Sequence, residues 1–139
     1  MAGAPARTLV IDESLDKRLA VELARRGRPA KSVSSLGLRG SSDSDLLDRL
    51  DAQLGAWVLV TADDRMPEGQ ARALAAGNGA VATIGPRGDS AAWPLEAYRH
   101  EVVHRWAHAM HAQLPGTARR YGLTNQRAWR PRLGRTRGR

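Results

Sequence analysis

The chain has 139 residues, no cysteine, and 22 Lys+Arg residues against 14 Asp+Glu residues. This length allows one domain with a single hydrophobic core, and the absence of cysteine excludes disulfides, zinc–thiolate centres and thiol catalysis. The sequence has no apolar run near the roughly 20 residues that span a bilayer, and its start lacks the apolar segment of a signal peptide. We therefore expect a cytoplasmic protein that does not contact membranes.

Strands and helices are expected to alternate along the chain. Leu15, Leu19 and Leu23 recur at helical spacing, Ser42 is a suitable helix N-cap, and the apolar run at 56–60 is typical of a strand buried on both faces. The expected elements are strands at 7–11, 31–33, 56–60 and 79–84 and helices at 14–26, 43–54, 67–76 and 94–113. This alternation predicts an α/β fold of three layers, with helices flanking both faces of a mostly parallel sheet.

Acidic residues follow two of the expected strands and open one expected helix. They are Asp12 and Glu13 after the first strand, Asp43 and Asp45 at the start of the helix at 43–54, and Asp63 and Asp64 after the strand at 56–60. The carboxyl ends of parallel strands meet at one edge of the sheet, where such folds bind ligands. Crowded carboxylates require a cation, and Mg²⁺ or Mn²⁺ is the usual partner of hard oxygen ligands. The sequence therefore predicts a divalent-metal nuclease site.

Three segments resemble the compact PIN-like proteins related to VapC toxins. They are IDESL at 11–15, LGLRGSSDSDLL at 36–47 and VLVTAD at 58–63. Each segment is short, but their order and spacing together make the resemblance fairly specific, and it covers about residues 7–85. It implies a PIN-like fold and a metal-dependent endoribonuclease, often the toxin of a toxin–antitoxin pair.

The resemblance also implies roles for single residues. By position, Asp12, Asp45 and Asp63 would be the catalytic carboxylates that bind Mg²⁺ or Mn²⁺. Asp43 would lie close by as a further ligand, and Thr61 would support the loop. The metal would activate a water molecule and stabilise charge on the phosphoryl oxygens of RNA. An antitoxin protein and a homodimer are the further partners that this interpretation allows.

One position departs from the family pattern. Relatives often carry a further acid two residues beyond the Thr-x-Asp aspartate, and this chain has Arg65 there. Asp64, which is adjacent, and Asp89, which follows the strand at 79–84, are the candidates for this fourth acid.

The net charge of +8 resides in the last residues, because residues 1–118 contain 14 basic and 14 acidic side chains. We therefore expect a flexible N-terminus at 1–6, one PIN-like domain at 7–118 and a basic arm at 119–139. The arm is expected to bind nucleic-acid phosphates, with Trp129 or Tyr121 stacking on a base. Its candidate phosphate ligands are Arg119, Arg120, Arg127, Arg130, Arg132 and Arg135. A solvated tail and a protein-binding surface are alternatives, and the alternative function is a non-catalytic nucleic-acid-binding module.

A histidine pattern occurs on the last expected helix. His100 and His104 match the H-E-x-x-H pattern of zinc proteases. Together with His108 and His111 they fall within an arc of about 80° around the helix, opposite its apolar residues. The Gly-x-x-His extension of one protease class does not follow His104. Metal binding and a solvated or RNA-facing polar stripe are therefore favoured over proteolysis.

Overall fold

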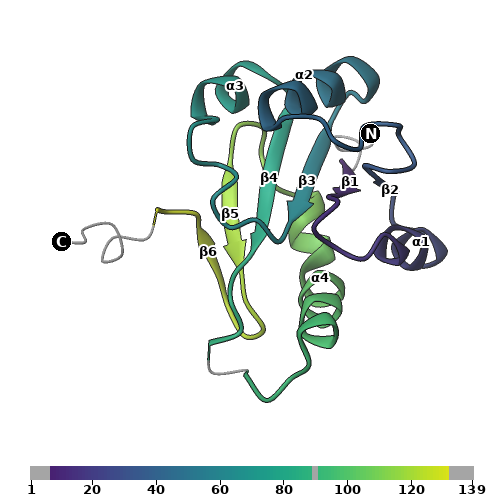
Figure 1. Cartoon of the computed structure of the whole chain (residues 1–139), viewed down its shortest axis with the longest axis vertical. Helices are drawn as coiled ribbons and strands as arrows, with labels where there is room; N and C mark the ends of the chain where they lie inside the picture. Colours follow the sequence, from purple (N-terminus) through teal and green to yellow (C-terminus); the bar gives the residue numbers. More distant parts are fainter. Residues whose placement is uncertain (1–6, 89–90, 132–139) are drawn as a thin grey trace, which may run out of the picture.

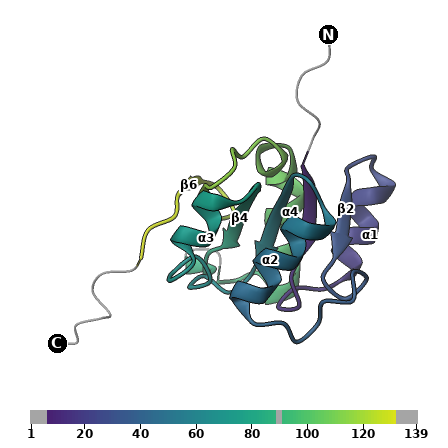
Figure 2. The same cartoon turned by 90° about the horizontal axis from the view of Figure 1, so that it is seen from above.

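A six-stranded sheet with helices on both faces makes up the described part of the chain (Figures 1 and 2). The computed structural model describes residues 7–88 and 91–131, so the N-terminus predicted to be flexible at 1–6 lies outside the described residues. The elements in chain order are β1 (Thr8–Ile11), α1 (Arg18–Arg25), β2 (Ala30–Ser32), α2 (Asp43–Gln53), β3 (Trp57–Thr61), α3 (Ala71–Ala76), β4 (Gly79–Ile84), α4 (Leu95–His111), β5 (Ala118–Tyr121) and β6 (Gln126–Ala128).

The strand order of the sheet is β2-β1-β3-β4-β5-β6. Pairs from β2 to β5 are parallel, and only the pair of β5 with β6 is antiparallel. The expected α/β class with a mostly parallel sheet is therefore confirmed. The chain passes from β1 to β2 on one side and then returns to place β3 on the other side of β1. This puts a topological switch point between β1 and β3, the place where parallel α/β sheets usually bind ligands.

Alternate residues of the central strands divide the core into two layers. Leu9 and Ile11 of β1 pack in one layer with residues of α1 and α4. Val10, between them, packs in the other layer with Leu50 of α2 and Leu74 of α3. This alternation is the two-residue period of a strand. All of β3 is buried, as expected for a strand covered on both faces.

All four helices lie within their expected ranges, but α1 and α3 begin later than expected. The hydroxyl of Ser42 caps α2 by accepting the N–H of Asp45 at 3.3 Å, as predicted. The helix expected at 67–76 begins only at Ala71, because Gly69 has a φ of +85° that an α-helix does not contain. Within the described part of the chain, no helix has both the length and the apolar character that a membrane crossing requires.

The helix expected at 14–26 begins instead at Arg18. Residues 12–15 form a turn, in which the hydroxyl of Ser14 donates to the carboxylate of Asp12 at 2.8 Å and accepts the N–H of Ala62 at 3.0 Å. These contacts hold the segment against the end of β3 and keep it out of the helix.

Residues 118–128 form two strands of the sheet, so the predicted basic arm is wrong for this segment. Parallel pairing sets Arg119 opposite Ala82 and Arg120 opposite Thr83, and β6 pairs with the outer side of β5. The side chain of Tyr121 is fully buried among residues of the core. The single domain therefore extends beyond the predicted boundary at residue 118, and residues 132–139 lie outside the described residues.

We expect Gly79→Ala to destabilise the fold. Gly79 begins β4, and a Cβ there would overlap the indole ring of the buried Trp57, which is held by a hydrogen bond from Nε1 to Asp51 at 2.9 Å. Overpacking of this kind costs about 1–3 kcal/mol, which should lower the midpoint of urea denaturation. Gly55→Ala is the control, because a Cβ there meets no atom within 4 Å. An equal loss in both variants would contradict this packing.

Candidate functional site

The ends of β1 and β3 meet at the switch point of the sheet. The N–H of Asp12, the residue directly after β1, donates to the carbonyl of Val60 at 3.0 Å. This bond continues the parallel pairing one residue beyond β1, so that Asp12 lies next to Thr61 at the end of β3. The side chain of Thr61 is fully buried, whereas Asp12 is half-buried and Asp63 is exposed.

Two hydroxyl groups hold the carboxylate of Asp12. Thr61 Oγ1 donates to Asp12 Oδ2 at 2.7 Å, and Ser14 Oγ donates to the same oxygen at 2.8 Å. Each hydroxyl has a single proton, which it donates to Asp12. Ser14 Oγ and Thr61 Oγ1, which lie 3.2 Å apart, are therefore two donors to the same acceptor. No hydrogen bond within residues 7–88 and 91–131 uses Asp12 Oδ1, so this oxygen is the one available to a cation.

The loop after β3 is fixed by the same threonine. The N–H of Asp63 donates to Thr61 Oγ1 at 3.0 Å, and the carboxylate of Asp63 accepts the N–H of Arg65 at 3.0 Å. The second bond closes a short turn of the kind that aspartate favours. One hydroxyl therefore positions both Asp12 and the backbone of Asp63.

Asp43 is the acid of α2 whose charge couples to this pair. Burial raises the pKa of Asp43, and the negative charges of Asp63 and Asp12 raise it further. Asp45 lies two residues further on, about 200° around the helix axis, so the two acids leave α2 in different directions, although both are exposed. The role of Asp45 as a metal ligand stays a prediction.

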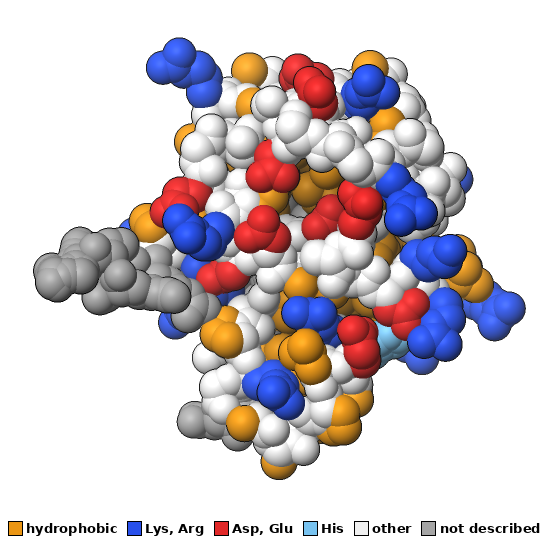
Figure 3. Space-filling view, viewed as in Figure 1, with side chains coloured by type: hydrophobic (Ala, Val, Ile, Leu, Met, Phe, Trp, Pro, Cys, Tyr) orange, Lys and Arg blue, Asp and Glu red, His pale blue; other side chains and the backbone are white. Residues whose placement is uncertain are grey.

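Acidic side chains gather on the face of the molecule that contains the end of β3 (Figure 3). The ligand atoms of Asp12, Asp43 and Asp63 do not converge to within 4.8 Å, since the groups of described residues that do so lie elsewhere. Carboxylates repel one another, and a divalent cation is what would draw them together. Their donor set, made only of carboxylate oxygens, fits a hard cation such as Mg²⁺ or Mn²⁺.

A groove of about 670 Å³ begins at Asp63 and passes between the ends of β3 and β4. Three arginines line it together with small and apolar residues: Arg65, Arg87 and Arg99. None of these arginines is among the site residues expected from the sequence. Arg65 follows β3 and Arg87 follows β4, in the same way that the predicted acids follow β1 and β3. Their place after these strands is the sequence signal from which they could have been predicted as site residues. Acidic and basic side chains therefore meet at one edge of the sheet.

Asp64, one candidate for the fourth acid, takes part in an ion pair inside the fold. Arg120 donates two hydrogen bonds to its carboxylate, at 2.7 Å and 2.9 Å, and the hydroxyl of Thr83 donates to it at 3.1 Å. The side chain of Arg120 is only 8% exposed, so this ion pair is buried. Asp89, the other candidate, lies outside the described residues.

The first residues of the predicted basic arm are committed to the fold. Arg120 and Tyr121 are buried, so the expectation that they contact nucleic acid is wrong. Arg119 is partly buried and donates to Gln126 at 2.6 Å. Trp129 donates its indole N–H to the carbonyl of Asp64 at 2.7 Å. Of the other predicted phosphate ligands, Arg127 and Arg130 are exposed, and Arg132 and Arg135 lie outside the described residues.

Comparisons with protein family models, with curated proteins and with solved structures give no match to this chain. The resemblance to PIN-like proteins therefore rests on the sequence motifs alone. Activity, substrate and partners are matters for proposal.

We expect Asp43→Asn to raise the free energy of unfolding at pH 7. The pKa of Asp43 is raised in the folded state. The carboxyl group therefore contributes fully to folding stability below its unfolded pKa of about 4, and this contribution is lost as the pH rises through the folded pKa. The ionised group therefore opposes folding at neutral pH, because burial and repulsion outweigh the favourable dipole of the helix N-terminus. Asp43 is largely solvated, so the expected gain is below about 1 kcal/mol.

Urea denaturation of this variant at pH 7 and at about pH 3 checks the sign, since both pH values bracket the ordinary pKa of an aspartate. The gain should disappear at the lower pH. Asp48→Asn, an exposed acid on the same helix, is the matched control and should show no such pH dependence. A gain of equal size at both pH values would contradict the proposed repulsion.

Proposed function

We propose that this protein is a metal-dependent endoribonuclease with a PIN-like fold, in which Asp12, Asp43 and Asp63 bind Mg²⁺ or Mn²⁺. The observation that carries the proposal is the network at the switch point. Thr61 Oγ1 donates to Asp12 at 2.7 Å and accepts the N–H of Asp63 at 3.0 Å, so the two carboxylate-bearing loops are held side by side. The cation would then draw the carboxylate oxygens of the three acids the rest of the way together.

Each part of the edge has a role in the hydrolysis of a phosphodiester. The bound cation would supply an activated water molecule and a counter-charge for the phosphoryl oxygens. Asp12 is oriented by two hydroxyls that donate to Oδ2, which leaves Oδ1 for the cation. The Thr61 hydroxyl also fixes the backbone from which the Asp63 carboxylate extends. Because Thr61 is fully buried, its hydrogen bonds face little competition from solvent.

The groove beside Asp63 supports RNA as the substrate. Arg65, Arg87 and Arg99 line this groove, and guanidinium groups neutralise backbone phosphates without reading the bases. Cleavage would then be directed by the shape and flexibility of single-stranded RNA more than by base contacts. The motif resemblance supports a further step, in which the protein is a toxin and an antitoxin protein covers this edge.

We expect Asp12→Asn to lower metal-dependent cleavage of labelled RNA by at least about 100-fold, because a ligand of the cation is lost. RNA binding should persist, since the arginines of the groove are unchanged. The assay compares Mg²⁺, Mn²⁺ and EDTA, and Asp48→Asn serves as a control that retains activity.

Cleavage at the wild-type rate by Asp12→Asn, or cleavage that survives EDTA, would contradict the proposed site. RNA binding by the wild-type protein without cleavage in either metal would instead favour the non-catalytic nucleic-acid-binding module. The exposed Arg127 and Arg130 would then be the first residues to replace.

A further inference from the structure

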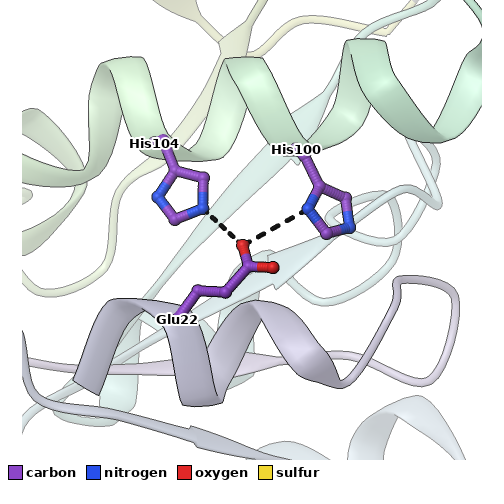
Figure 4. Close-up of side chains that lie close together, drawn as sticks. All are labelled: Glu22, His100 and His104. Atoms are coloured by element: carbon purple, nitrogen blue, oxygen red, sulfur yellow. Dashed lines mark hydrogen bonds and ion pairs between the residues drawn. The ribbon is translucent and has the colours of Figure 1, made fainter. Parts of the chain in front are cut away.

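A group of metal-ligand side chains lies between α1 and α4 (Figure 4). His100 and His104 stand one turn apart on α4, and both point toward Glu22 of α1. His104 Nε2 lies 2.6 Å from Glu22 Oε1, and His100 Nδ1 lies 3.3 Å from the same oxygen. One ligand atom from each of the three residues lies within 4.8 Å of the others.

The packing of the two helices brings these side chains together. Leu19 and Leu23 of α1 belong to the same core layer as Val103 and Ala107 of α4. The polar residues at the border of this contact are half-buried, with exposed fractions of 23% for His100, 15% for His104 and 39% for Glu22. Partial burial limits competition from water for the ligand atoms.

A second carboxylate orients one of the imidazoles. Asp16 Oδ2 lies 3.2 Å from His100 Nε2, on the far side of the ring from Glu22, and Asp16 is itself held by Arg18 at 2.7 Å. Metal-binding histidines usually donate their other ring N–H to a carboxylate, which fixes the tautomer and the ring orientation. When Nε2 of His100 carries the proton and donates it to Asp16, the lone pair of Nδ1 is available to a metal ion.

We propose that His100, His104 and Glu22 bind a divalent transition-metal ion of the Zn²⁺ type, which joins α1 to α4. Two imidazoles and one carboxylate suit Zn²⁺ and not the harder Mg²⁺. Zn–ligand bonds of about 2.0–2.1 Å in a tetrahedron separate the ligand atoms by about 3.3 Å. The His100–Glu22 separation of 3.3 Å already matches, and the 2.6 Å separation from His104 widens by a small rotation of the Glu22 side chain.

The arrangement differs from that of a zinc protease. Glu101, the acid inside the H-E-x-x-H pattern, pairs with Arg105 at 2.9 Å and is not among the three side chains that converge. The interpretation of His100 and His104 as a solvated or RNA-facing stripe is likewise wrong, because both rings face α1. The site therefore serves to fix the two helices. Arg26 is exposed and lies 3.2 Å from His104 Nδ1. When His104 Nδ1 carries the proton, the side chain of Arg26 turns toward solvent.

Titration of the full-length protein with Zn²⁺ alone, followed by calorimetry, tests this site. The protein carries Asp12→Asn so that the acidic edge of the sheet does not contribute to Zn²⁺ binding. We expect about one Zn²⁺ per chain and a rise in Tm of several degrees. His104→Gln should weaken binding at least about 10-fold. His108→Gln, an exposed histidine one turn further along α4, is the matched control and should bind as before.

Glu22→Gln is a second variant that keeps the shape of the side chain, and circular dichroism checks that each variant folds. Co²⁺ in place of Zn²⁺ should give the visible absorption of a tetrahedral ion, which both ligand variants lose. Absence of Zn²⁺ binding, or equal weakening by His104→Gln and His108→Gln, would overturn the proposal. Zn²⁺ binding does not depend on nuclease activity, so the two proposals fail independently.

Discussion

The buried hydroxyl of Thr61 is the group on which the candidate site depends. It donates to Asp12 and accepts from the backbone of Asp63, and so ties together the two loops that leave the switch point of the sheet. Parallel pairing alone would bring the ends of β1 and β3 to one edge, but it would not orient the carboxylates. The hydroxyl provides that orientation, and Ser14 strengthens it from the turn before α1.

Charges at this edge are arranged so that acids and bases have separate roles. Asp64 and Arg120 neutralise each other inside the fold, which removes one acid from the cluster and one arginine from the surface. This leaves Asp12, Asp43 and Asp63 as the proposed cation ligands. Burial and the negative charges of Asp63 and Asp12 raise the pKa of Asp43, so its ionised form opposes folding at neutral pH.

The sequence predicts the parts of the fold that depend on local patterns. Apolar runs locate the central strands, and the cap at Ser42 locates the start of α2. The missed features depend on distant contacts. The strand that carries Arg120 was not predicted, because a charged side chain argues against a buried strand. Arg120 can be buried only because it pairs with Asp64, 56 residues away. The late start of α1 depends on the contact of Ser14 with Ala62, 48 residues away. That the charge of Asp43 interacts with Asp63 and Asp12 depends on how α2 packs on the sheet.

Cation binding at the switch point can be tested directly by an anomalous diffraction map of crystals soaked in Mn²⁺. We expect a peak at the carboxyl edge of the sheet, about 2 Å from carboxylate oxygens of Asp12, Asp43 and Asp63. Such a peak would identify the ligands without relying on any assay of activity. A map whose peaks all lie away from Asp12, or a map with no peak at this edge in crystals that bind Mn²⁺ elsewhere, would show that these acids do not bind the cation.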